Sequence, residues 1–423
     1  MRQIIITLSL FVLLCQHLYA KQFLSLSDVI SLGIKNNPQI KISSKIKEEY
    51  FFQKNMIKAK FFPYLYLNYN YQRQDLGRNK PSVDFHYFGP SLTWNIFSGF
   101  SDWHAYKEAL LLIAAQDENI KSVILNISMN IIQAYLEYFK QKALYKAALI
   151  DLKDAKTILK LAKKKYEVGL APYADVLDAE ARVKKAEFNV TNYKYTSEIA
   201  KANVLTLINY DITQADSFEF LPVKETDLKA KNLADCIKLG LMKRPELKAK
   251  EKEILAQEEK VKEVKGKFLP SINLVSSYYK EDSKFFPDRD YEFTAGIEIQ
   301  WPIFLGLSRW EELKKERATL EQKHFEKTQT ELEVKQEIFT NYKRWQTAKE
   351  NYESAIAWLK SIEEDYRIIK KKYETGLASI VDLTTTLARL SEARSQVAVS
   401  KYNFILSYYN LQKSMGFIPG LEK

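Results

Sequence analysis

The sequence predicts a mixed α and β fold. In this fold, several protomers share one membrane-spanning β-barrel, to which each contributes four strands, and the barrel continues into long coiled-coil-like helices. Three observations predict it: an internal duplication with an offset of 207 residues, strands of alternating polarity, and helical runs of about sixty residues. The chain has 423 residues, of which 46% are hydrophobic, so it can bury a large core and is not intrinsically disordered. Its 2 cysteines and 4 scattered histidines exclude a disulfide framework and offer no metal-ligand spacing.

The first twenty residues have the pattern of a secretory signal peptide. A positive start is followed by an apolar run from Ile4 to Cys15 and by a small residue, Ala20. The run is shorter than the roughly 20 apolar residues of a membrane-spanning helix. We expect residues 1–20 to be removed after Ala20; the alternative is a lipoprotein acylated on Cys15, which the bulky Leu14 before it disfavours. The protein is therefore expected to be exported.

The duplication organises the rest of the chain. Residues 26–33 recur at 233–240, residues 94–99 at 301–306, and residues 165–171 at 372–378. A constant offset without gaps indicates two copies of one structural unit. We therefore expect a first repeat at 21–210, a linker at 211–232, a second repeat at 233–417 and a short tail at 418–423.

Within each repeat the apolar pattern changes from helical spacing to strict alternation. Ser27 or Asp28 is placed to cap a first helix that runs to about Lys60. Alternation then predicts a β-hairpin at about 63–97 in the first repeat and another at about 270–304 in the second.

The last predicted strand has one apolar and one polar face. Its apolar residues are Phe293, Ala295, Ile297, Ile299 and Trp301, and they alternate with Glu292, Thr294, Gly296, Glu298 and Gln300. Strands of about ten residues with this alternation and with terminal aromatics are typical of transmembrane β-barrels. The signal peptide favours this interpretation over a soluble hairpin packed on a helix. We expect the lipid-facing positions to be Phe293, Ile297, Ile299 and Trp301.

After each hairpin the chain is helical for about sixty residues without proline. From Ile338 to Tyr373 apolar residues recur in steps of three and four, as in coiled-coil packing. Each long helix ends in a basic turn that complements its dipole, followed by Gly169 or Gly376, where a left-handed residue is expected. A second helix then returns toward the end of the repeat.

The strand number also constrains assembly. Four strands cannot close a barrel, and an open sheet edge cannot lie in lipid because its backbone N–H and C=O groups would be unpaired. If these strands cross a membrane, several protomers must contribute to one barrel.

The chain resembles the TolC-like outer-membrane factors of efflux and type I secretion systems. The resemblance rests on the duplication, on the hairpin after Phe-x-Pro, and on Tyr-x-x-Gly-Leu with an aspartate six residues after the glycine. It implies a homotrimer with a twelve-stranded barrel in the outer membrane, an α-helical tunnel through the periplasm and a small equatorial domain. It also implies export of substrates delivered by a periplasmic adaptor (membrane fusion protein) and an inner-membrane RND or ABC transporter.

The resemblance further implies roles for residues at the helix tips. Asp175 and Asp382 match acidic positions at the periplasmic entrance, and Tyr373 matches a tyrosine that helps to hold the entrance closed. Well-known members carry an arginine and a second carboxylate where this chain has Ala378 and Thr385, which implies a reduced latch.

Two alternative interpretations apply to the tips. Ser379 to Asp382 has the pattern of a capping box, and an acid in the first turn stabilises a helix in any case. In the first repeat, Asp178 could take the entrance role instead of Asp175. The tip segments Gly169-Leu170 and Gly376-Leu377 match adaptor contacts in the family, and the alternative is ordinary helix capping with one exposed leucine.

Other classes of function find little support in the sequence. No nucleophile elbow, phosphate-binding glycine loop, His-Glu-x-x-His or Cys-x-x-Cys occurs, so we expect no enzyme, no metal site and no cofactor. The chain has 64 basic and 53 acidic residues, but they are interleaved at helical spacing, which disfavours nucleic-acid binding. The main alternative is an exported coiled-coil structural protein or adhesin. The cargo is left open, because a polar tunnel would accept drugs, metals, peptides or proteins.

Overall fold

The computed structural model describes residues 22–75, 77–78, 81–223 and 228–418. The expected signal peptide and the end of the expected tail lie outside these residues. The chain divides into two compact units. The helix-pair unit comprises Met1–Lys41, Ser122–Arg244 and Glu333–Lys423, and the sheet unit comprises Ile42–Lys121 and Pro245–Leu332.

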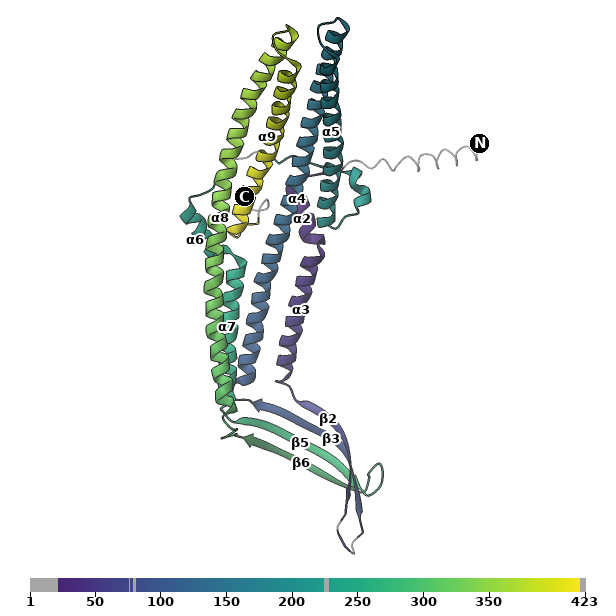
Figure 1. The fold of residues 1–423 in the computed structure, drawn as a ribbon. Coiled ribbons are helices and arrows are strands. Elements are labelled where there is room, and N and C mark those ends of the chain that lie inside the picture. Colours follow the sequence, from purple (N-terminus) through teal and green to yellow (C-terminus); the bar gives the residue numbers. More distant parts are fainter. Residues whose placement is uncertain (1–21, 76, 79–80, 224–227, 419–423) are drawn as a thin grey trace, which may run out of the picture. The chain divides into compact units, whose positions relative to one another are not determined.

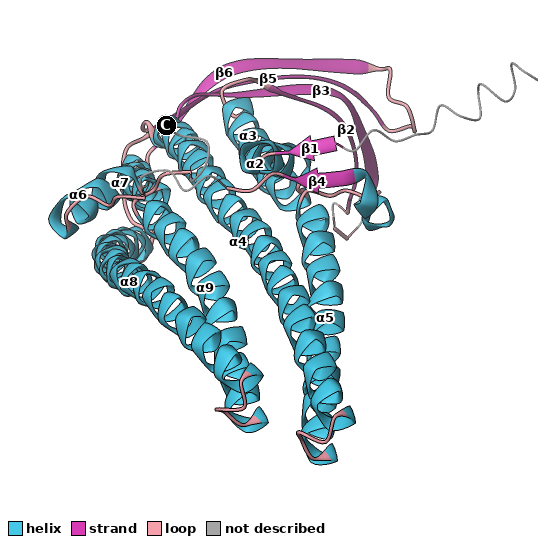
Figure 2. Ribbon diagram, turned by 90° about the horizontal axis from the view of Figure 1, so that it is seen from above, coloured by secondary structure: helices cyan, strands magenta, loops and turns pink. Residues whose placement is uncertain are grey.

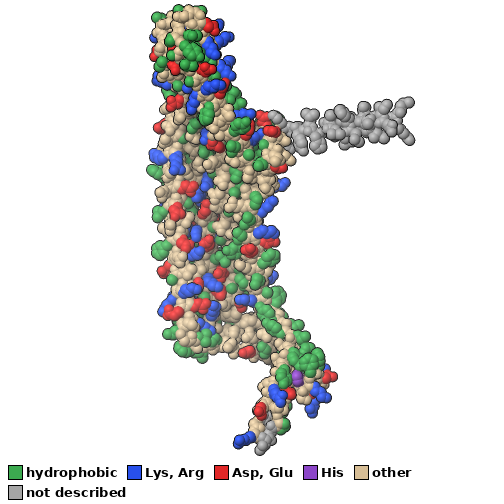
Figure 3. Space-filling model, turned by 45° about the vertical axis from the view of Figure 1, so that its right-hand side comes forward, with side chains coloured by type: hydrophobic (Ala, Val, Ile, Leu, Met, Phe, Trp, Pro, Cys, Tyr) green, Lys and Arg blue, Asp and Glu red, His purple; other side chains and the backbone are tan. Residues whose placement is uncertain are grey.

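The helices confirm the duplication, because each helix of the first repeat has a counterpart whose two ends both lie 207 residues later (Figure 1). The pairs are α2 (Leu26–Asn36) with α6 (Leu233–Lys243), α3 (Pro38–Ala59) with α7 (Pro245–Gly266), α4 (Ser101–Glu167) with α8 (Ser308–Glu374), and α5 (Tyr173–Leu207) with α9 (Ile380–Ser414). The basic and acidic side chains are interleaved over these helices rather than gathered in one patch on the face drawn in Figure 3.

The expected single helix from Ser27 to about Lys60 is wrong in two details. Ser25 is the N-cap, and its side chain and backbone form a capping box with Asp28. The chain then breaks at Asn37, which has φ −61° and ψ 126°, before Pro38 starts α3. Proline disfavours the helical conformation of the residue before it and provides no N–H to the helix, so one helix becomes two.

The helix-pair unit has a core around α2, α4 and α5. Tyr135, which is fully buried, donates a hydrogen bond from its hydroxyl to the carbonyls of Leu24 and Leu221 at 3.2 and 2.5 Å. Leu24 is the last residue of β1 (Gln22–Leu24) and Leu221 directly follows β4 (Phe218–Phe220), and β1 and β4 form a short parallel pair. β4 and the 3₁₀ helix η2 (Ile212–Ser217) fall within the expected linker.

A second core in the same unit joins the ends of α4, α5, α8 and α9. It contains Ala155, Ala162, Ile362 and Tyr373, which are all buried, and the last two belong to the predicted run from Ile338 to Tyr373. Tyr166, at the position in the first repeat that corresponds to Tyr373, is instead exposed. Identical sequence positions in the two repeats therefore face different surroundings.

The sheet unit contains one four-stranded antiparallel sheet in the order β2-β3-β5-β6 (Figure 2). The strands are β2 (Tyr64–Gln74), β3 (Val83–Phe97), β5 (Ser271–Asp282) and β6 (Asp290–Gln300). The central pairing of β3 with β5 joins the two repeats. The outer edges of β2 and β6 pair with no other strand of the described chain.

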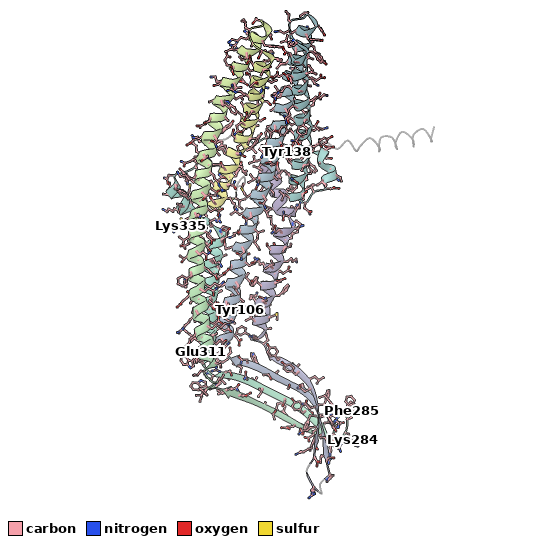
Figure 4. The ribbon with its side chains drawn as sticks, in the orientation of Figure 1. Tyr106, Tyr138, Lys284, Phe285, Glu311 and Lys335 are labelled. Carbon is pink, nitrogen blue, oxygen red and sulfur yellow. The ribbon has the colours of Figure 1, made fainter. Side chains whose placement is uncertain are left out.

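The register confirms that the sheet has one apolar and one polar face. On the apolar face, Trp94, Leu274 and Ile297 form one row across three strands. On the polar face, Asn95 donates to Asn273 at 2.8 Å and Ser277 and Thr294 share a hydrogen bond of 2.6 Å. Tyr69 on β2 packs its ring on Phe285 in the β5–β6 loop, beside Lys284 (Figure 4).

Trp301 corrects the predicted strand. β6 ends at Gln300, so Trp301 is not a strand residue, and its indole N–H donates to the carbonyl of Phe268 at 3.1 Å. The corresponding Trp94 donates in the same way to Phe61 at 2.9 Å, although it lies within β3. Among the described residues, no helix is long and apolar enough to span a membrane.

Candidate functional site

Both helix tips end in the same glycine-based turn. Gly169 and Gly376 have φ of +75° and +82°, and the next N–H, of Leu170 or Leu377, reaches back to the carbonyl of Lys165 or Lys372 at 2.8 and 2.7 Å. This is the Schellman ending, which favours glycine because a side chain is strained at positive φ. Leu170 and Leu377 are 76% and 79% exposed. Ordinary helix capping thus accounts for the glycines but leaves two leucines in solvent.

Asp382 is part of a capping box, as its spacing from Ser379 predicts. Its carboxylate accepts hydrogen bonds from the backbone N–H and the hydroxyl of Ser379 at 3.0 and 2.7 Å, and its own N–H bonds back to Ser379 Oγ at 3.1 Å. These bonds, the backbone one first, lower the pKa of Asp382. The carboxylate is therefore ionised at neutral pH and is exposed at the start of α9.

Asp175 occupies the corresponding place on α5 without such a box. The N-cap there is Pro172, which has no side-chain cap, so Asp175 contributes only its charge to the first turn. That charge acts on Tyr373: burial first, and then Asp175, raise the pKa of the Tyr373 phenol. Within one protomer Tyr373 thus lies within the electrostatic reach of Asp175, the other residue predicted at the entrance.

Lys165 completes this group, and sequence analysis did not single it out. Its ammonium lies 4.1 Å from the centroid of the Tyr373 ring and donates to the Tyr373 carbonyl. Tyr373 is 2% exposed, and its hydroxyl has no hydrogen-bond partner within the described chain. A cation on one tip thereby holds an aromatic side chain of the other.

A buried ion cluster lies further along the same helices and was also missed by sequence analysis. Arg394 on α9 donates to Asp151 at 2.8 Å and to Asp154 at 2.9 Å, both on α4, and Ser391 donates to Asp151. Burial opposes the charge of Arg394, but the hydrogen bonds that it donates to Asp154 and Asp151 raise its pKa. The only sequence signal of this cluster is a pair of polar residues, three positions apart, on an otherwise apolar face of each helix. These pairs are Asp151 with Asp154 on α4 and Ser391 with Arg394 on α9.

The surroundings of the ion cluster are strongly desolvated. Burial first, and the charge of Asp154 second, raise the pKa of Tyr366 to about 12. Burial also lowers the pKa of Arg182, against the opposing charge of Asp151. Across the residues that the structure describes, no group of three or more His, Cys, Asp or Glu side chains could hold a metal ion.

Duplicated helix pairs joined to a four-stranded sheet with two open edges define the architecture of outer-membrane channel subunits. The family model described as "outer membrane efflux protein" matches residues 29–209 and 236–417, and the chain belongs to this family.

Known relatives cover nearly the whole chain. The probable efflux pump outer membrane protein TtgC of Pseudomonas putida is 22% identical over 420 residues, covering 93% of this chain and 83% of TtgC. The alkaline protease secretion protein AprF of Pseudomonas aeruginosa is 19% identical over 413 residues, covering 93% and 85%. The crystal structure of the Campylobacter jejuni CmeC outer membrane channel has the same fold, with a TM-score of 0.79, 18% identity and coverage of 92% and 85%.

Proposed function

We propose that three copies of this chain form an outer-membrane channel-tunnel that exports substrates of a tripartite efflux pump or a type I secretion system. The observation that carries the proposal is the four-stranded sheet, which has one apolar face, one polar face and two open edges. Since open edges are not tolerated in lipid, the sheet must be completed by other copies. Relatives named for an efflux pump and for protease secretion support export as the common function.

The other parts of the chain have places in this proposal. The helix-pair unit forms the periplasmic tunnel, and the segment 211–232 with β1 and β4 belongs to the equatorial region. Leu170 and Leu377, both exposed in the protomer, contact a periplasmic adaptor that links the channel to an inner-membrane RND or ABC transporter. The signal peptide directs export, and the channel carries no enzymatic activity.

Fractionation and cross-linking test the assembly. The protein should fractionate with outer membranes, migrate as a heat-resistant oligomer on SDS gels, and stop at three chains when cross-linked in detergent. A stable monomer that needs no detergent would instead identify an exported coiled-coil protein or adhesin.

We further propose that Asp175 and Asp382 of three copies line the periplasmic entrance, which Tyr373 helps to hold closed. Six carboxylates would then share one mouth, and charges within about 8 Å, the Debye length at physiological salt, act together. A ring of acids raises the local cation concentration. The entrance should prefer cations although the chain as a whole is basic.

Neutralising these aspartates should therefore lower cation selectivity. In planar bilayers, Asp175→Asn/Asp382→Asn should also lose block by multivalent cations added from the periplasmic side. The matched control is Asp28→Asn, because Asp28 forms the same capping box with Ser25 but lies on α2. If the double variant selects and blocks like wild type while its thermal stability falls as in Asp28→Asn, the aspartates only stabilise the first turns of their helices.

A further inference from the structure

The helices α8 and α9, which run side by side in Figure 1 and Figure 2, enclose a groove that is lined mainly by polar side chains. Its volume is about 470 Å³, within the range of about 300–1,000 Å³ that is typical of small-molecule sites. Uncharged hydrogen-bonding side chains contribute most of the lining: Thr340, Thr347 and Asn351 on α8, and Gln396, Ser400 and Asn403 on α9. A small polar molecule therefore fits between these two helices.

Two cations complete the lining, and the chain itself leaves them unneutralised. Lys343 and Arg344 are both exposed, and no acidic residue is among the described residues that line the groove. The ammonium of Lys343 donates to the amide oxygen of Gln346 at 3.0 Å, and within the described chain neither cation forms a salt bridge. Lys349, which is on the same helix but outside the lining, instead lies 3.9 Å from Glu353. The groove thus has a net positive charge.

The duplication does not explain these two cations. Lys343 corresponds to Leu136 in the first repeat, and Leu136 is 1% exposed. Arg344 corresponds to Glu137, which has the opposite charge and lies 2.5 Å from Lys140. The basic groove is therefore specific to the second repeat.

The groove opens on the side of α8 that faces away from α6. On the α6 side, a methyl group on Gly240 would lie 2.3 Å from Cδ1 of Ile338, so the two helices are in close contact there. At 3.6 residues per turn, Thr347 and Asn351 lie about 180° and about 220° around α8 from Ile338. In the proposed tunnel α6 must lie outside, because an additional helix inside would obstruct the bore. The groove would then face the lumen.

We propose that this groove binds the anionic group of organic molecules that pass through the tunnel. Arg344 and Lys343 pair with a carboxylate, sulfonate or phosphate, and a guanidinium presents its donors in a fork that matches two oxygens of such a group. The hydroxyls and amides of the lining orient the polar part of the ligand, and the ring of Phe339, which is 49% exposed, contacts its apolar part. The inference rests on the proposed function and names a class of cargo for it, organic anions with an apolar portion.

A site in the path of export has to release its ligand. Binding in a channel must be favourable enough for entry and weak enough for exit. Because Lys343 and Arg344 are exposed, water and salt screen their charges. These properties favour repeated capture and release over tight retention.

The acidic entrance proposed at Asp382 does not cancel the charge of the groove. Asp382 and Gln396 are 14 residues apart on α9, which corresponds to about 21 Å along the helix. Charges further apart than the Debye length, about 8 Å at physiological salt, are largely screened from one another. The entrance and the groove therefore act as separate charged zones, and an anion added on the extracellular side reaches the groove without passing the entrance.

Two dyes of similar shape and opposite charge test the groove. The anion carboxyfluorescein should bind to the detergent-solubilised trimer and gain fluorescence anisotropy, whereas the cation tetramethylrhodamine methyl ester should not. Lys343→Gln/Arg344→Gln should weaken carboxyfluorescein binding about tenfold, because the variant removes both charge-assisted contacts and keeps polar side chains in their place. Micelles without protein give the background.

The matched control is Lys349→Gln/Lys360→Gln. It removes the same net charge from α8, but neither residue lines the groove. Its affinity for carboxyfluorescein should stay within about twofold of wild type, since exposed charges away from a contact are screened by salt. Equal losses from the two double variants would show that the dye responds to the overall charge of the helix, which overturns the site, and so would equal binding of the two dyes.

Channel recordings separate this inference from the proposed function. Carboxyfluorescein added on the extracellular side of a planar bilayer should reduce the current of wild type, and Lys343→Gln/Arg344→Gln should need about tenfold more dye for the same block. A conducting trimer that the dye neither binds nor blocks overturns the groove as a cargo site. A protein that forms no pore overturns the proposed channel instead, whether or not the dye binds.

Discussion

Arg394→Ala is expected to destabilise the helix-pair unit by about 3 kcal/mol, because removing one partner of a buried ion pair leaves the other charge without compensation. The variant would leave Asp151, whose side chain is 9% exposed, in a desolvated site beside Asp154. The effect is set near the lower end of the range for buried pairs because the Arg394 side chain keeps 19% exposure. Denaturant unfolding of the detergent-solubilised protein, followed by circular dichroism, measures the change.

A salt bridge on the same helix provides the matched control. Arg389 on α9 lies 3.8 Å from Asp365, and the two side chains are 55% and 41% exposed. Exposed pairs of this kind contribute about 0–1 kcal/mol, so Arg389→Ala should have little effect. Similar small losses from both variants would show that the Arg394 cluster is solvated and not a buried network. If it is buried, adding Asp151→Asn to Arg394→Ala should recover part of the loss, since one uncompensated charge is removed.

The fold could be predicted from the sequence because its signals are repeated. The 207-residue offset aligns all four helix pairs at both ends, and alternation identifies the four strands. The capping box at Ser379 and the left-handed turns at Gly169 and Gly376 depend only on a few neighbouring residues, so they too could be read directly.

Features that depend on tertiary contact or on very short segments were not predicted. The strands β1 and β4 have three residues each, too few to show alternation. The break at Asn37 was missed because proline is also a favourable first residue of a helix and therefore does not show where the preceding helix stops. Tyr166 and Tyr373 occupy equivalent sequence positions, but Tyr373 is buried in the core at the helix ends with Lys165 over its ring, whereas Tyr166 is exposed, and this difference depends on tertiary packing.

The orientation of the sheet in the membrane leads to the second large effect. Ile297 lies on the edge strand β6, at the end of the row that it forms with Leu274 and Trp94, and is 66% exposed in the protomer. If this face contacts lipid with Ile297 near the bilayer midplane, Ile297→Arg should destabilise the barrel by about 2–4 kcal/mol, the cost of a basic side chain at that depth. The loss should appear as a lower guanidinium midpoint of the heat-resistant oligomer in lipid vesicles.

Substitutions on the opposite face separate lipid contact from simple damage to the strand. Gln300→Arg should have a much smaller effect, since a polar face toward the lumen can solvate the added charge, but Gln300 lies at the end of β6. Glu298→Arg is therefore the depth-matched control, because it changes the residue next to Ile297 on the polar face. Equal losses at Ile297 and Glu298 would mean that neither face is distinguished by lipid, and larger losses at Glu298 would mean that the faces are reversed. A loss of stability with Ile297→Arg but not with Glu298→Arg would show that the apolar row of Trp94, Leu274 and Ile297 contacts the hydrocarbon. In that orientation an added charge is costly on the lipid face and tolerated on the face toward the lumen.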